Sequence, residues 1–437
     1  MSEKPQNSAA PRTPPTARDL AARVLLRVEG DGAFAAPALD AELDRHPALD
    51  PRERRLTTEL VYGVIRTRGA LMRRLLAHAP RGLSDPHVTT ELLLAAYQLL
   101  LLDRIPAHAA VDAAVSAVTR KRGSKVGGFA NALLRRLARE NDKLDLRGAL
   151  ITSLPEWLWQ RLSAAVGRED AEALLGVTGD IGKTWVRVRD GAAEQRAAWL
   201  ASADSGALSR LSRLAPAGDP EKLPGFTQGD FVVQEQGAQF VGLALGVRPG
   251  ERVLDACAGR GQKTSLFVEQ SQPGGSVFAS DVHPKKLERL KRELERLQLP
   301  SVETAAVDLR LGVGALPGDF DRVIVDAPCT GVGTLRRRPE IGQRLTPDDP
   351  ARMGALAAEI LRGAATRARP SGRVVFAVCS VLPEECEAVV DSVRDVLEPA
   401  PFDAPEVVER FGSTSSFRIT PKDDGVDGYF VASFLRR

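Results

Sequence analysis

One stretch of the sequence decides the fold class: Val253-Leu254-Asp255-Ala256-Cys257-Ala258-Gly259-Arg260-Gly261. A short apolar run leads into an acidic residue, and a Gly-x-Gly turn follows. Glycine lets the backbone pass close to a ligand, and the N-terminus of a helix after such a turn attracts negative charge. The stretch therefore predicts a buried strand, a ligand-binding loop and the start of a helix.

Two common nucleotide-binding motifs do not fit this loop. A dinucleotide fingerprint needs a third glycine, but the frame that begins at Gly259 ends on Thr264. A P-loop needs a further glycine upstream of Gly261-Gln262-Lys263-Thr264, and none stands at the required spacing. A nicotinamide-dependent dehydrogenase is therefore the least favoured enzyme class.

From Gln236 onward, strand-like apolar runs alternate with segments of helical spacing. This alternation predicts a doubly wound, mostly parallel sheet, with the last strand inserted antiparallel near the sheet edge. The expected strands are Arg252–Ala256, Ser276–Asp281, Glu303–Val307, Arg322–Asp326, Arg373–Val378 and Tyr429–Phe434. The expected helices are Lys263–Glu269, Pro284–Leu297, Pro350–Ala368 and Glu384–Leu397.

Two cysteines follow two of these strands. Cys329 stands in Asp326-Ala327-Pro328-Cys329, and Cys379 stands in Val378-Cys379-Ser380. Ligands bind at the carboxyl ends of strands in an open α/β sheet, so both thiols could face one pocket. A thiolate is a strong nucleophile and a second thiol can move a proton, which suggests covalent catalysis. The alternative is that both are small buried apolar side chains.

Four aspartates also end predicted strands in register. Any one of them could be a helix cap or a turn residue. Together they indicate a ligand site along the carboxyl edge of the sheet. They are Asp255, Asp281, Asp308 and Asp326.

Composition limits the class of protein. The chain has 437 residues, of which 43% are hydrophobic and 27% charged, as expected for a globular protein of two or three domains. No apolar run is long enough for a membrane span, and the N-terminus lacks a signal peptide's apolar core. The four cysteines lack CxxC spacing, which argues against disulfides or a metal site and fits a reducing cytoplasm.

The N-terminal part has a different pattern. Residues 1–15, rich in proline, predict a disordered leader. Residues 16–145 have helical spacing and predict five to seven short helices, and 150–235 predict a small α+β connector before an α/β domain at 236–437. The expected helix breaks are Gly30-Asp31-Gly32, Pro80-Arg81-Gly82 and Gly127-Gly128.

Positive charge gathers in this N-terminal part. Residues 1–150 hold 24 Lys and Arg against 17 Asp and Glu, a net charge of +7, whereas the remainder carries −4. An uneven basic charge suggests an anionic partner such as nucleic acid, although a solvated helical surface would look the same. The expected phosphate contacts are Arg120, Lys121, Arg122 and Lys125.

The acid-x-x-x-Gly-x-Gly loop resembles the first motif of class I S-adenosylmethionine-dependent methyltransferases. Nearly the whole chain resembles the bacterial 16S ribosomal RNA cytosine-5 methyltransferases of the RsmB (Sun/Fmu) family. The helical part carries the resemblance in Thr58–Val64, Pro106–Val111 and Asn131–Arg136. The rest carries it in Asp255–Ala258, Lys263-Thr264, Asp326–Gly331, Arg336-Arg337, Pro339-Glu340, Cys379–Glu385 and Asp427–Phe430.

The resemblance implies a fold and an activity. The fold is a class I methyltransferase domain, Rossmann-like with a mostly parallel seven-stranded sheet, after an all-α NusB-like RNA-binding domain and the connector. The activity is methylation of C5 of a specific cytosine in 16S ribosomal RNA with S-adenosylmethionine as cofactor. A cytoplasmic monomer with no membrane or metal partner is expected.

Residue roles follow from the same resemblance. Cys379 would attack C6 of the base, Cys329 would serve the release step, and Asp326 would lie near cytosine N3. Arg336 and Arg337 would contact RNA. The expected cofactor-binding residues are Cys257, Ala258, Gly259, Arg260, Gly261, Gln262, Lys263, Asp281, Asp308 and Asp326.

The cofactor loop departs from the family pattern, which usually reads Ala-Ala-Pro-Gly-Gly-Lys-Thr. Arg260 replaces the proline and Gln262 replaces the second glycine, while Gly259 restores the generic Gly-x-Gly. Two alternatives therefore stay open. One is a non-catalytic RNA-binding or ribosome assembly factor, and the other is a methyltransferase of transfer RNA or of another ribosomal site.

Overall fold

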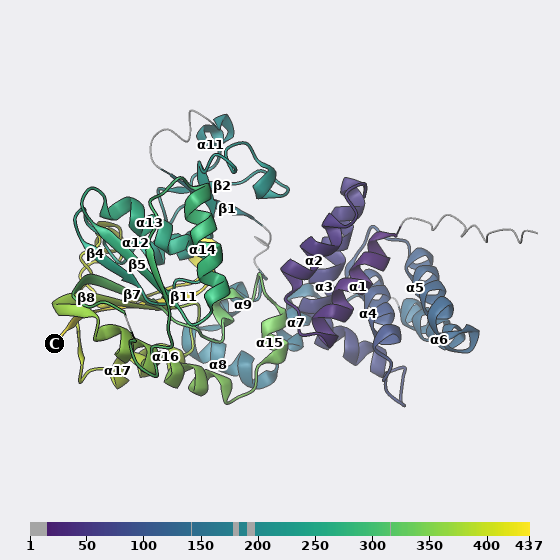
Figure 1. Ribbon diagram of the computed structural model, residues 1–437. Helices are drawn as coiled ribbons and strands as arrows, with labels where there is room; N and C mark the ends of the chain where they lie inside the picture. The colour runs from purple at the N-terminus through teal and green to yellow at the C-terminus, as the bar shows by residue number, and fades with distance from the viewer. Residues whose placement is uncertain (1–14, 141, 178–182, 190–196, 315) are drawn as a thin grey trace, which may run out of the picture. The chain divides into compact units, whose positions relative to one another are not determined.

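The computed structural model describes residues 15–140, 142–177, 183–189, 197–314 and 316–437 (Figure 1). The chain forms two compact units. One unit is Met1–Pro155 together with Arg338–Gln343, and the other is Glu156–Arg337 together with Arg344–Arg437. Apart from Pro15, the predicted leader lies outside the described residues.

The first unit is helical. Three of its helices begin at side-chain caps: Thr16 accepts from the Asp19 N–H, and Asp50 and Asp85 each precede a proline in the first helical turn and accept from N–H groups of that turn. Apolar side chains at helical spacing then meet in one core. The helices are α1 (Ala17–Gly30), α2 (Ala35–Asp44), α3 (Pro51–Leu76), α4 (Pro86–Leu101), α5 (Ala107–Arg122), α6 (Ser124–Glu140) and α7 (Leu146–Ser153).

Two of the three predicted helix breaks are confirmed, and the third is wrong. The chain turns after Gly30 and around Pro80–Gly82, but Gly127 and Gly128 lie inside α6. The break between α5 and α6 is at Gly123, which has φ +85°. Gly127 instead lets the two helices approach, because a Cβ there would lie 1.9 Å from Oγ1 of Thr119.

The segment Arg338–Gln343 belongs to the helical unit although it is remote in sequence. The Ala35 N–H donates to Oε1 of Glu340 at 3.0 Å, and the Gln343 side-chain amide donates to the Ile65 carbonyl. The guanidinium of Arg338 lies over the ring of Phe34. Glu340 is only 2% exposed, so this segment is built into the helical unit.

The second unit begins with the connector. Its helices α8 (Glu156–Val166) and α9 (Arg168–Leu174) precede an antiparallel sheet of order β2-β1-β3. The central strand of this sheet is β1 (Trp185–Val188), between β2 (Ser212–Leu214) and β3 (Phe231–Val233). The short helix α11 (Ala198–Ser202) and a 3-10 turn at Pro220–Lys222 complete it. Residues 150–155, expected in the connector, fall in the helical unit.

The large sheet has the order β10-β11-β8-β7-β4-β5-β6, and β9 pairs with β11. It is therefore eight-stranded, one strand more than expected. Strands β8, β7, β4, β5 and β6 are parallel, and β11 is antiparallel, as predicted. The strands are β4 (Arg252–Asp255), β5 (Ser276–Asp281), β6 (Glu303–Ala306), β7 (Phe320–Asp326), β8 (Ala368–Val378), β9 (Leu397–Pro399), β10 (Ser416–Ile419) and β11 (Tyr429–Arg436).

Helices cover both faces of this sheet (Figure 1). Val253 of β4 points into the core beneath α12–α14, whereas its neighbour Leu254 points into the core beneath α16 and α17. Side chains alternate in this way because successive strand residues face opposite sides. The covering helices are α12 (Gln236–Leu243), α13 (Gln262–Ser271) and α14 (Pro284–Arg296) on one face, and α16 (Asp349–Ala365) and α17 (Glu387–Ser392) on the other. Three further short helices of the chain are α15 (Glu340–Arg344), which begins in the segment of the helical unit, α18 (Pro405–Phe411) and α19 (Pro421–Asp424).

The predicted helix Glu384–Leu397 is mostly wrong. The chain forms a 3-10 turn at Pro383–Glu385, then α17, and Leu397 already begins β9. Cys386 separates the turn from the helix, because its φ of −112° and ψ of −96° are not helical. The side chain of Glu385 is drawn toward the ends of β7 and β8 instead of lying along a helix.

Candidate active site

The two predicted cysteines meet. Cys379 follows β8 directly, Cys329 lies just beyond the end of the adjacent strand β7, and their sulfur atoms are 3.3 Å apart. The hydrogen bond with Cys379 raises the pKa of Cys329 well above the ordinary thiol value, and burial adds to that increase. Cys329 therefore keeps its proton at neutral pH, and either sulfur can be the donor in the contact between the two thiols.

Glu385 ties together the loops that carry these cysteines. Its carboxylate accepts from the Thr330 N–H and the Thr330 hydroxyl, both at 2.6 Å, and from the Ser380 hydroxyl at 2.5 Å. Burial raises the pKa of Glu385, while these hydrogen bonds oppose that increase. Each bonded residue directly follows one of the two cysteines.

Lys263 and Asp326 form an ion pair between the cofactor loop and β7. The Lys263 ammonium in the first turn of α13 lies 2.6 Å from Oδ2 of Asp326. Burial alone would lower the pKa of Lys263, but the charge of Asp326 and its hydrogen bond raise it.

The other strand-terminal aspartates have different surroundings. Burial raises the pKa of Asp255 to about 7, although the Thr264 hydroxyl donates to it at 2.7 Å. Asp281 accepts from the Gly259 N–H at 3.1 Å, which joins the end of β5 to the cofactor loop. Asp308 lies on the rim beyond β6, where a hydrogen bond from Arg310 lowers its pKa.

The predicted loop forms the turn between β4 and α13. Gly259 and Gly261 have φ of +56° and +86°, which favour glycine. A Cβ on Gly259 would meet no atom nearer than the Cys257 carbonyl oxygen at 4.0 Å, so the space beside it is open to a ligand. Arg260 is exposed at the apex, and the Gln262 side chain donates to the Val233 carbonyl at 2.6 Å. Gln262 thus binds the connector.

Cys257 lies in the same turn and differs from the catalytic candidates. Burial raises the pKa of its thiol, and the carboxylates of Asp255, Asp326 and Asp281 raise it further. A thiol surrounded by negative charge resists ionisation, which argues against a nucleophilic role for Cys257.

Arg336, predicted to contact RNA, does not lie on an RNA-accessible surface. Its guanidinium is buried and donates to Oδ1 of Asp427 at 3.3 Å. Arg337 donates to Oδ2 of the same carboxylate at 2.8 Å and is partly exposed. Asp427 is fully buried and needs both cations, so these arginines stabilise the turn before β11.

The predicted basic cluster of the helical unit is on its surface. Arg120, Lys121 and Arg122 form the last turn of α5, and Lys125 lies in the first turn of α6. All four are exposed. Arg120 and Arg122 pair with Asp19 and Asp85, at 3.2 and 2.5 Å.

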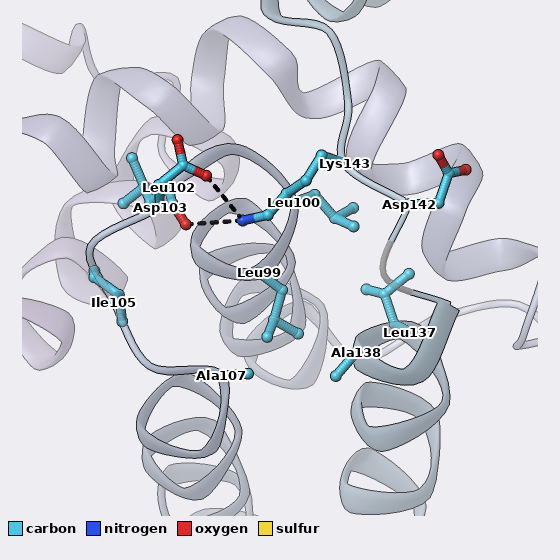
Figure 2. Close-up of a pocket in the computed structure, with 10 residues that line it drawn as sticks. All are labelled: Leu99, Leu100, Leu102, Asp103, Ile105, Ala107, Leu137, Ala138, Asp142 and Lys143. Carbon is cyan, nitrogen blue, oxygen red and sulfur yellow. Dashed lines mark hydrogen bonds and ion pairs between the residues drawn. The ribbon is translucent and has the colours of Figure 1, made fainter.

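A cavity of about 100 Å³ lies elsewhere, in the helical unit (Figure 2). Leu99, Ile105 and Leu137 line it, and Lys143 closes it by contacts with Asp103 and the Leu102 carbonyl. It contains none of the predicted site residues. No helix within the described residues is long and apolar enough to cross a membrane.

Glu385 and Asp427 stand within the motifs Cys379–Glu385 and Asp427–Phe430, but the sequence alone points to no role for either. A signal was present for Glu385, because a second glutamate next to Glu384 stands a short distance after Cys379. The sequence alone does not show that its carboxylate turns back to Thr330 and Ser380.

Comparisons with known proteins agree with this geometry. A family model described as 16S rRNA methyltransferase RsmB/F matches residues 242–435, and one for the NusB family matches 15–139. A probable ribosomal RNA small subunit methyltransferase B of Bacillus subtilis is 30% identical, over 96% of this chain and 98% of its own. The Pseudomonas putida ribosomal RNA small subunit methyltransferase B is 34% identical, over 85% and 87%.

Solved structures show the same fold. The crystal structure of PH0851 matches with a TM-score of 0.80 at 20% identity and covers 97% of this chain and 99% of its own. The structure of NSun6 from Pyrococcus horikoshii with SFG matches with a TM-score of 0.54 at 16% identity, over 64% and 98%. The match to PH0851 extends over both units of the chain.

Proposed function

Because the chain belongs to the RsmB/F family of S-adenosylmethionine-dependent 16S ribosomal RNA methyltransferases, we propose that it methylates C5 of a specific cytosine through a covalent adduct of Cys379. The observation that carries this proposal is the 3.3 Å contact between Cys379 and Cys329 at the ends of adjacent strands. Covalent catalysis with a separate release step needs one group that attacks C6 of the base and a second group that removes the proton from the neighbouring C5.

The residues around the loop fit the cofactor, which when bound supplies an electrophilic methyl group. The open space beside Gly259 admits a ligand close to the backbone. Asp281 already holds the loop and would accept from the ribose hydroxyls, and Asp308 would lie toward the adenine. Cys257 and Ala258 would form the wall, and Lys263 would orient the site through Asp326. Arg260, exposed at the apex, would lie toward the methionine carboxylate.

Cys379 would begin the reaction. C5 of cytosine is a poor nucleophile, and addition of a thiolate at C6 converts the ring into an enamine whose C5 can accept a methyl group. As N3 takes up a proton during the addition, the Asp326 carboxylate would accept a hydrogen bond from it and stabilise the adduct.

Cys329 would complete the reaction by removing the C5 proton. Two causes of its raised pKa, the hydrogen bond and the negative charge, come from Cys379. Once the Cys379 sulfur is bonded to C6, both are removed and the pKa of Cys329 falls. Cys329 would then lose its own proton to water, its thiolate would take the C5 proton, and the Cys379–C6 bond would break so that the methylated base leaves.

RNA would be held by the helical unit. Lys121 and Lys125 are exposed and project from neighbouring helix ends, where they can reach phosphates. The target base of a structured RNA would have to leave its stack to reach the thiols. We place the protein in the cytoplasm, where free thiols stay reduced.

The test is methylation of 16S ribosomal RNA, free or in the small subunit, followed by bisulfite sequencing. A single new 5-methylcytosine that depends on the protein is the expected result. Transfer RNA as the sole methylated substrate would overturn the ribosomal assignment. Calorimetry with S-adenosylmethionine tests the remaining alternative. If the protein binds no cofactor at millimolar concentration, it is a non-catalytic RNA-binding factor.

A further inference from the structure

Glu385 bridges the two cysteine loops through a single buried carboxylate. Oε1 accepts from the Thr330 N–H, and Oε2 accepts from the hydroxyls of both Thr330 and Ser380. Glu385 has 0% of its surface exposed, so all three bonds are shielded from water. Charge-assisted bonds of this kind are short and strong and fix the geometry of their donors.

The backbone that carries Glu385 is itself fixed. Helix α16 lies against it at Gly354, where a Cβ would meet the Glu384 carbonyl oxygen at 2.0 Å. The Cys386 thiol lies 3.6 Å from the Ser380 carbonyl oxygen and joins the same turn to the Cys379 loop. The carboxylate therefore projects from a rigid turn.

The two cysteines depend on this carboxylate unequally. Two of the three bonds hold Thr330, the residue after Cys329. Cys379 has a separate support, because its carbonyl oxygen accepts from the Gly333 N–H at 3.0 Å. Loss of Glu385 would therefore displace Cys329 more than Cys379.

We propose that Glu385 is a positioning residue that keeps Cys329 against Cys379, so that Cys329 can receive the C5 proton once the adduct has formed. This inference rests on the proposed function for the step that it serves. The thiol contact itself can be measured without RNA or cofactor, which separates the two.

The first experiment measures closure of a Cys329–Cys379 disulfide in the full-length protein with diamide. Two thiols give their two protons and two electrons to the nitrogen–nitrogen double bond of diamide, which becomes a hydrazine as the sulfur–sulfur bond forms. Peptide mass spectrometry identifies the Cys329–Cys379 pair. Closure should slow roughly tenfold to 10²-fold in Glu385→Ala, since displacement of about 1 Å has effects of that size on reactions between positioned groups.

The matched variants separate positioning from folding. Glu385→Gln keeps an acceptor for the Thr330 N–H and should restore most of the closure rate. Glu387→Gln, an exposed neighbour that pairs with Arg418, should close at the wild-type rate. Thr330→Val removes the hydrogen bond from the Thr330 hydroxyl to Glu385 and should give a rate of disulfide closure between those of wild type and Glu385→Ala. If Glu385→Ala does not fold, this variant tests the proposal instead.

The second experiment follows the reaction with RNA and S-adenosylmethionine. Glu385→Ala should accumulate a covalent RNA–protein adduct on denaturing gels, with product release slowed more than adduct formation. Wild-type closure rates in all three Glu385 and Thr330 variants would overturn the positioning role. If the variants close the disulfide slowly but the wild-type protein does not methylate RNA, the positioning role stands and the proposed function is rejected.

Discussion

Lys263 Nζ lies 2.6 Å from Oδ2 of Asp326 and so joins the first turn of α13 to the end of β7. The cofactor loop and the strand that leads to Cys329 are therefore held together by one ion pair, with side chains 13% and 30% exposed. Asp326 belongs to both halves of the site, because it borders the cofactor loop and is the residue assigned to cytosine N3.

Removal of the Lys263 ammonium should lower the free energy of unfolding and also the rate of methylation. Lys263→Met leaves the Asp326 carboxylate in place without its cation, and breaking such a pair costs about 3 kcal/mol. Urea unfolding should show this loss. The double variant Lys263→Met/Asp326→Asn removes both charges and should recover most of the stability while staying inactive. Equal stability of the single variant and wild type would contradict the prediction.

The two cysteine variants should fail at different steps. Cys379→Ala should lose methylation and form no adduct, while retaining cofactor binding by calorimetry, because its sulfur makes the bond to C6. Cys329→Ala should still form the adduct but not resolve it, which leaves a covalent RNA–protein species on denaturing gels. Cys386→Ser, which keeps a donor for the Ser380 carbonyl and lies outside the Cys329–Cys379 contact, is the matched control and should turn over. Normal turnover by Cys379→Ala would reject the nucleophile assignment.

Asp255 should make stability fall as pH rises. In the unfolded chain it ionises near 3.8, but burial raises its pKa in the native state to about 7. Between these values the native state holds a proton that the unfolded state has lost, so the free energy of unfolding decreases with pH, by on the order of 4 kcal/mol for this shift. Asp255→Asn should therefore gain stability over wild type from pH 4 to pH 7, measured by thermal unfolding.

Asp349 provides the control of opposite sign. Hydrogen bonds from Arg352 and Thr346 lower its pKa to about 2, so its contribution to stability is present above its ordinary pKa of 3.8 and disappears as pH falls toward 2. Asp349→Asn should be less stable than wild type at neutral pH, with the difference closing in acid. The same pH slope in both variants would contradict the assignment for Asp255.

Charge reversal at Lys121 and Lys125 should lower the affinity for RNA and make that affinity less dependent on salt concentration. Each phosphate contact contributes about 0.7 to 0.9 to the slope of log affinity against log salt. Lys121→Glu/Lys125→Glu should therefore flatten that slope by roughly one to two. Arg394→Glu, an exposed arginine of the other unit, should leave it unchanged. An unchanged slope in the double variant would make the basic cluster a solvated surface only.

The sequence predicts the parts of the site that depend on backbone order. A strand followed by Gly259-Arg260-Gly261 leaves few alternatives for the turn, and adjacent parallel strands bring Cys329 and Cys379 to one edge. Side-chain partners are less predictable, because a long flexible side chain can reach several acceptors. Arg336 turned to Asp427, and Gln262 turned to Val233.

Helix boundaries fail for a related reason. The run Glu384–Leu397 has helical spacing, yet the carboxylate of Glu385 is held by Thr330 and Ser380, and the chain breaks at Cys386. Gly127 looks like a break in sequence but serves a close contact with Thr119. Tertiary contacts override local preference at both places.

The segment Arg338–Gln343 determines how the helical unit can be used outside this protein. The buried Glu340 accepts from the Ala35 N–H, so a chain cut after Pro155 would lose an acceptor from the interior of that unit. The helical unit is not a cassette that can be excised at one point and fused to a new enzyme. A chimaera between relatives would have to exchange this peptide together with the N-terminal helices. Otherwise the Ala35 N–H would lose its acceptor.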